Sequence, residues 1–186
     1  MKALELYPLE DIDHLIYPDD MAEVDKDSSA LLILTDFKLH QPFVIEASTP
    51  LGEAEKLMLR AHVKLKLVVN KSGEFRGIIS HADLGSQHTM PLISQGYSRQ
   101  DLTVEDLMTS RRDLAALGYR DLEGASIGQI VHTLQENGVQ HCLVVDRNEH
   151  TIRGLVSASD IARRLHLPVN IQRTPTFVDI FHAVRG

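Results

Sequence analysis

A short motif with residue types suited to nucleotide binding occurs twice in the sequence. It reads Gly-Ile-Ile-Ser-His-Ala-Asp over residues 77–83 and Gly-Leu-Val-Ser-Ala-Ser-Asp over residues 154–160. A carboxylate can accept hydrogen bonds from both hydroxyls of a ribose. A serine at a helix start offers its hydroxyl beside free backbone N–H groups, which together favour a phosphate. A glycine lets the backbone come close to a ligand or to a neighbouring strand.

The motif belongs to a longer internal repeat. Its two glycines lie 77 residues apart, at positions 77 and 154. Upstream, residues 62–70 align with residues 138–146 at an offset of 76, so the second copy has one extra residue between the two blocks. Further upstream, the apolar positions of residues 51–63 match those of residues 127–139. Agreement over three blocks with one single-residue shift indicates a true duplication.

Each copy predicts the same order of elements: strand, helix, strand, strand, helix. Apolar residues at helical spacing predict helices over residues 50–61 and 126–137. Thr49 suits the N-cap of the first helix, with Pro50 at its first position. Short helices are expected to begin near His81 and Ala158, each with the motif serine at or near the N-cap. Short apolar runs predict strands over residues 65–69, 75–80, 142–145 and 151–157.

The pattern divides the chain into five parts. We expect an N-terminal extension at 1–28, a first repeat at 29–86, a connection at 87–102, a second repeat at 103–167, and a tail at 168–186 with a short helix. Each half is too small to bury a robust core alone, so the two should fold as one module. The expected class is α/β (α+β), built from two pseudo-symmetric β-α-β-β-α repeats.

Composition narrows the class of function. The 186 residues are 43% hydrophobic and 24% charged, which excludes a disordered chain. The net charge of −7 gives no basic footprint for nucleic acid. No apolar run approaches the roughly 18 residues that span a bilayer, the acidic N-terminus is unlike a signal peptide, and Cys142 cannot form an internal disulfide. These features predict a cytoplasmic protein that binds neither membrane nor nucleic acid. The ten histidines show no metal-ligand spacing.

The repeat resembles the CBS domain, named after cystathionine β-synthase, and its tandem pair, the Bateman module. Both motifs fit the family's G-h-x-[ST]-x-x-D pattern, in which h is apolar. Residues 68–70 and 144–146 fit the strand before the family's turn, and residues 107–109 fit the segment that begins a repeat. The resemblance covers roughly residues 30–167. It implies two symmetry-related clefts between the copies, which in this family often bind adenosine nucleotides or S-adenosylmethionine.

The resemblance also implies roles for particular residues. Asp83 and Asp160 are expected to hold ribose, and Ser80 and Ser157 to hold phosphate.

Three residues of the first copy extend this set. Thr49 matches a threonine that can face the nucleotide in this family, and Lys64 lies at a position that is frequently basic. With His81 they could support a phosphorylated ligand. The second copy has Ala125 and Gln140 in place of the threonine and the lysine. Because the clefts draw on both repeats, the sequence leaves open which cleft these groups serve.

Each motif residue also has a structural explanation. An acid in the first turn of a helix is favourable with the helix dipole, and a serine N-cap stabilises a helix by about 1 kcal/mol. Neither explains the pair at a fixed spacing, so ligand contact is favoured for the motif. His81 and His141 are better interpreted as structural, and Cys142 as a buried, inert thiol.

Three functions are compatible with the sequence. The favoured one is a stand-alone regulatory module, a homodimer that binds AMP, ADP, ATP or S-adenosylmethionine and requires no other cofactor. Ligand binding would change its affinity for a regulated protein partner. The alternative is a nucleotide-independent scaffold for dimerisation or docking. An enzyme is the least favoured, because no catalytic motif is present and the remaining chain is too short for a catalytic domain.

Overall fold

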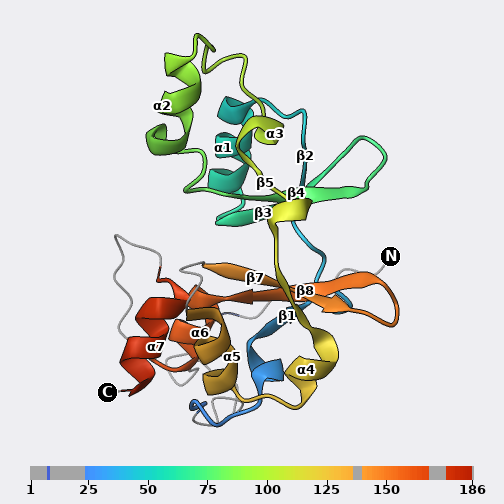
Figure 1. Cartoon of the computed structure of the whole chain (residues 1–186), viewed down its shortest axis with the longest axis vertical. Helices are drawn as coiled ribbons and strands as arrows, with labels where there is room; N and C mark the ends of the chain where they lie inside the picture. Colours follow the sequence, from blue (N-terminus) through green and yellow to red (C-terminus); the bar gives the residue numbers. More distant parts are fainter. Residues whose placement is uncertain (1–7, 9–23, 136–139, 168–174, 186) are drawn as a thin grey trace.

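The computed structural model describes residue 8 and residues 24–135, 140–167 and 175–185 (Figure 1). Most of the expected N-terminal extension, the Asn137-Gly138 helix stop and part of the C-terminal tail therefore lie outside the described residues.

The molecule contains two four-stranded sheets that face each other, with helices on their outer sides (Figure 1). The first sheet has the order β2 (Val44–Glu46), β3 (Leu65–Val69), β4 (Phe75–Ser80), β5 (Thr109–Ser110). Its helices are α1 (Leu51–Arg60), α2 (Ser86–Ser94) and α3 (Val104–Leu107). The second sheet has the order β1 (Leu34–Asp36), β8 (Thr151–Ser157), β7 (His141–Asp146), β6 (Ala116–Gly118). Its helices are α4 (Tyr119–Glu123), α5 (Ile127–Leu134), α6 (Ala158–Arg164) and α7 (Phe177–Arg185).

The main elements agree with the sequence prediction, and the mixed α/β (α+β) class is confirmed. The helix starts differ in two places. Pro50 is the N-cap of α1 and makes no side-chain cap bond, so the prediction of Thr49 as the N-cap was wrong. No α-helix begins at His81; a turn follows Ser80, and α2 starts only at Ser86. Gly85 interrupts the first copy at this point, whereas the second copy continues into α6 without a glycine.

Each sheet contains a strand from the opposite half of the chain. Strand β1 comes from the first repeat but pairs with β8, and β5 comes from the second repeat but pairs with β4. The segments before these strands also pair with the opposite half of the chain. Isolated bridges join Ser29 to Ser126 and Thr103 to Pro50. The two repeats are therefore interlocked, and the expected boundaries at 29–86 and 103–167 do not coincide with the sheets.

The motif glycines make this crossing possible. A Cβ atom on Gly154 would lie 2.6 Å from the Thr35 carbonyl oxygen of β1, and one on Gly77 would collide with the Thr109 carbonyl of β5. The sequence analysis allowed that each glycine lets the backbone approach either a ligand or a neighbouring strand. In both copies the structure shows a neighbouring strand at the glycine.

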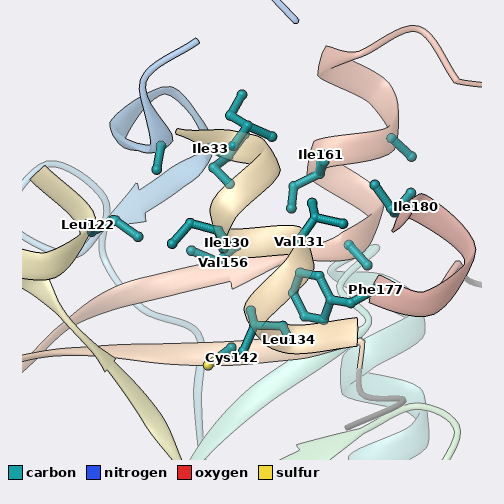
Figure 2. Packing of buried hydrophobic residues seen from close by; sticks show 14 of the residues in the cluster. Ile33, Leu122, Ile130, Val131, Leu134, Cys142, Val156, Ile161, Phe177 and Ile180 are labelled. Carbon is teal, nitrogen blue, oxygen red and sulfur yellow. The ribbon is translucent and has the colours of Figure 1, made fainter. Parts of the chain in front are cut away.

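Each half has its own hydrophobic core under its helices. In the first half the core includes Leu51, Met58, Val68 and Ile79. In the second half, α7 closes the core: the fully buried Phe177 ring lies beside Val131 and Leu134 of α5 (Figure 2). The predicted C-terminal helix is thus confirmed, and it covers the outer face of the second half.

An ion pair fastens β1 to the second sheet. The Arg153 guanidinium donates two hydrogen bonds to the Asp36 carboxylate, at 2.8 and 2.7 Å, and both side chains are only 14% exposed. These bonds hold the pKa of Asp36 below its ordinary value. Arg153 also lies over the Tyr119 ring, 4.3 Å from its centroid. The equivalent arginine of the first copy, Arg76, has only a 3.8 Å ion pair with Glu105, and both side chains are at least half exposed.

We expect Arg153→Lys to lower the thermal denaturation midpoint clearly, because lysine keeps the charge but loses the forked geometry and the ring contact. The matched control is Arg76→Lys, which should leave the midpoint close to wild type. Equal midpoints for the two variants, measured by circular dichroism, would contradict the assigned role of the Arg153 pair.

We expect Gly154→Ala to lower the free energy of unfolding by about 1–3 kcal/mol, because the new methyl group must displace β1. Gly52→Ala is the control: this position in α1 has open space around it, and alanine should stabilise the helix by about 0.5–1 kcal/mol. Urea denaturation measures both. Gly154→Ala with wild-type stability would show that β1 does not approach β8 as closely as described.

Candidate ligand-binding clefts

Two clefts lie where the halves meet, and each is lined by residues from both repeats. The larger one, which we call the Lys64 cleft, has a volume of about 780 Å³ and combines Lys64 with Ser157 and Asp160 of the second motif. The smaller one, the Asp83 cleft, has a volume of about 430 Å³ and combines Ser80 and Asp83 of the first motif with residues of the second repeat. The sequence left open which cleft Lys64 serves; the structure places it opposite the second motif.

The two clefts share a wall made of equivalent residues. Leu65 at the start of β3 and His141 at the start of β7 are 76 residues apart, the offset of the repeat in this block, and both line both clefts. The shared wall therefore contains a leucine from the first repeat and, at the equivalent position of the second repeat, a histidine.

The polar groups of the second motif face the Lys64 cleft and are only partly engaged. Ser157 is 6% exposed and stands at the N-cap of α6, but its side chain makes no cap hydrogen bond. Asp160, in the first turn of α6, forms an ion pair with the exposed Arg163 one turn further on. Ser159 also lines this cleft, and its hydroxyl is buried without a hydrogen-bond partner among the described residues. A buried hydroxyl without a partner is costly, so this arrangement favours a polar ligand.

The first motif is used differently, although its sequence pattern is the same. The Ser80 hydroxyl and backbone N–H both donate to the Asp83 carboxylate at 2.7 Å, and the Asp83 N–H donates back to the hydroxyl at 3.3 Å. The two side chains thus satisfy each other within a turn, and no helix begins there for the serine to cap. Ser157 does stand at a helix N-cap, but its hydroxyl makes no cap hydrogen bond.

The charges of the two clefts are opposite. Lys64 and Arg163 line the Lys64 cleft together with a single carboxylate, Asp160. The Asp83 cleft is lined by Asp83 and Asp113, and none of its described lining residues is lysine or arginine. A low-dielectric cleft concentrates such fields, so the Lys64 cleft suits an anionic ligand and the Asp83 cleft does not.

His141, in the shared wall, is held in its neutral form at pH 7. Burial lowers the pKa of His141 from 6.5 to about 4. The nearby Asp83 carboxylate opposes this shift and the Lys64 ammonium adds to it. The interpretation of His141 as structural therefore misses that it borders both clefts.

Five of the seven residues expected to bind ligand line a cleft, and two do not. Thr49 is half-buried where the segments cross, and its carbonyl accepts a 2.9 Å bond from the Val104 N–H. His81 is exposed, and its N–H donates to the Lys64 carbonyl at 2.8 Å. Neither is among the described residues lining the two clefts, so their expected contact with a ligand beside Lys64 stays a prediction.

The sequence reading missed several lining residues of the Lys64 cleft. Phe43 reaches it from the segment before β2, while His62 and His166 follow the ends of α1 and α6. A histidine directly after a helix end, where glycine or asparagine is usual, was a signal available in the sequence.

The described parts of the chain contain no group of three or more histidine, cysteine, aspartate or glutamate side chains that could hold a metal ion. None of their helices is long and apolar enough to cross a membrane. Cys142 is buried as expected, and burial raises the pKa of its thiol to about 11.

The family model of the CBS domain matches residues 34–84 and 122–167. These two regions make up just over half of the chain, and they correspond to the two copies of the repeat. The chain therefore belongs to the CBS domain family, as a tandem pair. A search of curated protein sequences finds no match.

Solved structures with the same fold are CBS-domain proteins or related chains. An uncharacterized conserved protein from Pyrococcus horikoshii has a TM-score of 0.58 at 21% identity, covering 79% of this chain and 98% of that one. CBSX2 in complex with AMP has a TM-score of 0.52 at 20% identity, covering 73% and 93%. The CBS domain pair of protein MJ0100, in complex with 5′-methylthioadenosine and S-adenosyl-L-methionine, has a TM-score of 0.51 at 19% identity, covering 73% and 94%. At these identities the likeness shows the fold.

The burial of His141 predicts an acid-sensitive fold. Unfolding restores the ordinary pKa of 6.5 to His141, so the unfolded chain takes up a proton on this residue below pH 6.5. In the folded chain the same imidazole is protonated only below about pH 4. Stability is therefore lost as the pH falls between these values, by about 2 kcal/mol on going from pH 7.5 to pH 5. His141→Leu, which copies the equivalent Leu65, should remove this part of the pH dependence.

Urea denaturation at pH 7.5 and pH 5 measures the effect. The control is His88→Leu, at an exposed histidine of α2, which should keep the wild-type difference between the two pH values. The same difference in His141→Leu as in wild type would contradict the assignment.

Proposed function

We propose that the protein is a regulatory module that binds an adenine nucleotide in the Lys64 cleft. The observation that carries the proposal is the combination in one cleft of Lys64 and Arg163 with Ser157, whose hydroxyl makes no cap hydrogen bond. Phosphate oxygens accept from ammonium, guanidinium and hydroxyl groups. The volume of about 780 Å³ lies within the range of small-molecule sites.

The remaining walls suit the nucleoside. Phe43, Leu65 and Leu155 line the same cleft with apolar surface on which an adenine ring can stack. Asp160 can accept from both ribose hydroxyls once Arg163 releases it, and Arg163 is then free to turn toward phosphate. Because the Arg163 side chain is 75% exposed, breaking this ion pair costs little.

The fold relatives give independent support for an adenosyl ligand. One was solved in complex with AMP, and another with 5′-methylthioadenosine and S-adenosyl-L-methionine. For this chain the positive charge of the Lys64 cleft favours a phosphorylated ligand over a sulfonium.

Regulation would follow from the position of the ligand between the repeats. A nucleotide that contacts Lys64 in the first repeat and Asp160 in the second stabilises the arrangement in which these two residues lie close together. A homodimer, or a regulated protein partner in the cytoplasm, that senses this arrangement would then respond to the nucleotide. We do not assign a catalytic step, since the cleft groups are explained by binding.

The Asp83 cleft supports a second candidate function, in which this part of the protein is a scaffold that binds no ligand. Its serine and aspartate satisfy each other at 2.7 Å, so the first motif needs no nucleotide to be stable. Mass spectrometry of the purified protein under native conditions distinguishes the candidates: a scaffold carries no bound nucleotide, whereas two nucleotides per chain would rule out an empty Asp83 cleft.

We expect Lys64→Gln, which copies the equivalent Gln140, to weaken ADP binding about tenfold or more, because a charge-assisted contact to phosphate is lost. Asp160→Asn should weaken ADP and adenosine alike, since it acts on ribose. The control is Lys56→Gln on the exposed face of α1, which should bind as wild type does. Isothermal titration calorimetry measures each affinity. The proposal fails if wild type binds none of AMP, ADP, ATP and S-adenosylmethionine, or if all variants bind ADP equally.

A further inference from the structure

Two histidines of the Lys64 cleft hold a backbone conformation that normally belongs to glycine. His62 and His166 both have φ of 51°, in the left-handed region, and both line this cleft. A non-glycine residue is held there at a cost in stability, and such residues concentrate at functional sites.

The turns themselves require this conformation. The Val63 N–H donates to the Met58 carbonyl at 3.1 Å, and the Leu167 N–H donates to the Ala162 carbonyl at 2.9 Å. These bonds close the ends of α1 and α6 in the motif whose left-handed position is usually glycine and sometimes asparagine. Because glycine would serve both turns better, the imidazole is not explained by the turn.

The two histidines come from different repeats and converge on the same cleft. His62 lies two residues before Lys64, and His166 lies three residues after Arg163. The cleft thus has two permanent cations and three imidazoles, those of His62, His166 and His141, against the single carboxylate of Asp160. Imidazole N–H groups can donate hydrogen bonds to phosphate oxygens.

We propose that His62 and His166 contact the outer phosphates of a nucleoside di- or triphosphate, and that they set a preference for it over a monophosphate. The inference rests on the proposed function, because it assigns the class of nucleotide for that site. Ser157 is buried and supplies a contact for the first phosphate. Lys64, Arg163 and the two histidines are exposed, so they lie toward the mouth of the cleft, where a longer phosphate chain leaves it.

The test replaces each histidine by glycine, which keeps the turn and removes the imidazole. His62→Gly and His166→Gly should each weaken ATP and inorganic tripolyphosphate about tenfold and change AMP affinity little, while their thermal midpoints equal or exceed that of wild type. The matched control is His150→Gly. His150 has φ of 52° in the turn after β7 and is not among the described lining residues of either cleft, so this variant should keep every affinity.

Titration calorimetry with the three probes, in buffer free of divalent cations, separates this inference from the proposed function. If tripolyphosphate binds and depends on the histidines while none of the nucleotides binds, the phosphate contacts of the histidines stand and the proposed nucleotide function fails. If ATP binds equally to wild type and to both histidine variants, the function stands and the inference is overturned. Loss of AMP and ATP to the same extent, or no binding of tripolyphosphate and ATP to wild type, also overturns it.

Discussion

The close contact between crossed strands is the constraint on which the rest of the structure depends. Neither sheet is complete without a strand from the other half, and each crossing strand packs against a glycine where a Cβ atom would collide. The chain must then pass between the halves twice. It does so after β1, where it brings Phe43 into the Lys64 cleft, and after β5, where it brings Asp113 into the Asp83 cleft. The same crossing that makes one module out of two repeats thus also supplies the walls of both clefts.

A duplicated frame allows two sites to diverge without a change of fold. Lys64 and Gln140 occupy equivalent positions, as do Leu65 and His141 and also Ser159 and Ala82, according to the offsets of the repeat. In the first two pairs the backbone position is kept and the side chain differs, whereas Ser159 lies in α6 and Ala82 in a turn. The outcome is one cleft rich in cations and unengaged hydroxyls, and another in which the serine and the aspartate bond to each other. Binding capacity is therefore set by side chains on a common scaffold, as expected when function resides in sites and not in folds.

The sequence predicted what depends on local pattern and on the repeat. Helices α1 and α5 followed from periodicity and the longer strands from apolar runs, whereas α2 and α4 were not predicted. The repeat with its resemblance indicated the paired fold. The crossing of β1 and β5 was not predictable, because strands of two or three residues carry no periodic signal. The place of Lys64 opposite Asp160 depends on how the halves pack, which no local pattern encodes. Identical motifs also hid a real difference: Ser80 and Ser157 share their spacing to aspartate, but a turn follows the serine in the first copy and a helix follows it in the second.

The shared wall gives the two clefts a short physical route to influence each other. His141 borders both, and its pKa already responds to the Asp83 carboxylate on one side and to the Lys64 ammonium on the other. A phosphate bound at Lys64 would offset the ammonium charge and so raise the pKa of His141, but the imidazole gains a proton, and the Asp83 cleft becomes less negative, only at acid pH. The coupling must act equally in the reverse direction, because a binding linkage is reciprocal. One buried side chain, at a position where the other repeat has leucine, therefore links the charge states of the two clefts in acid, whereas at pH 7 it stays neutral.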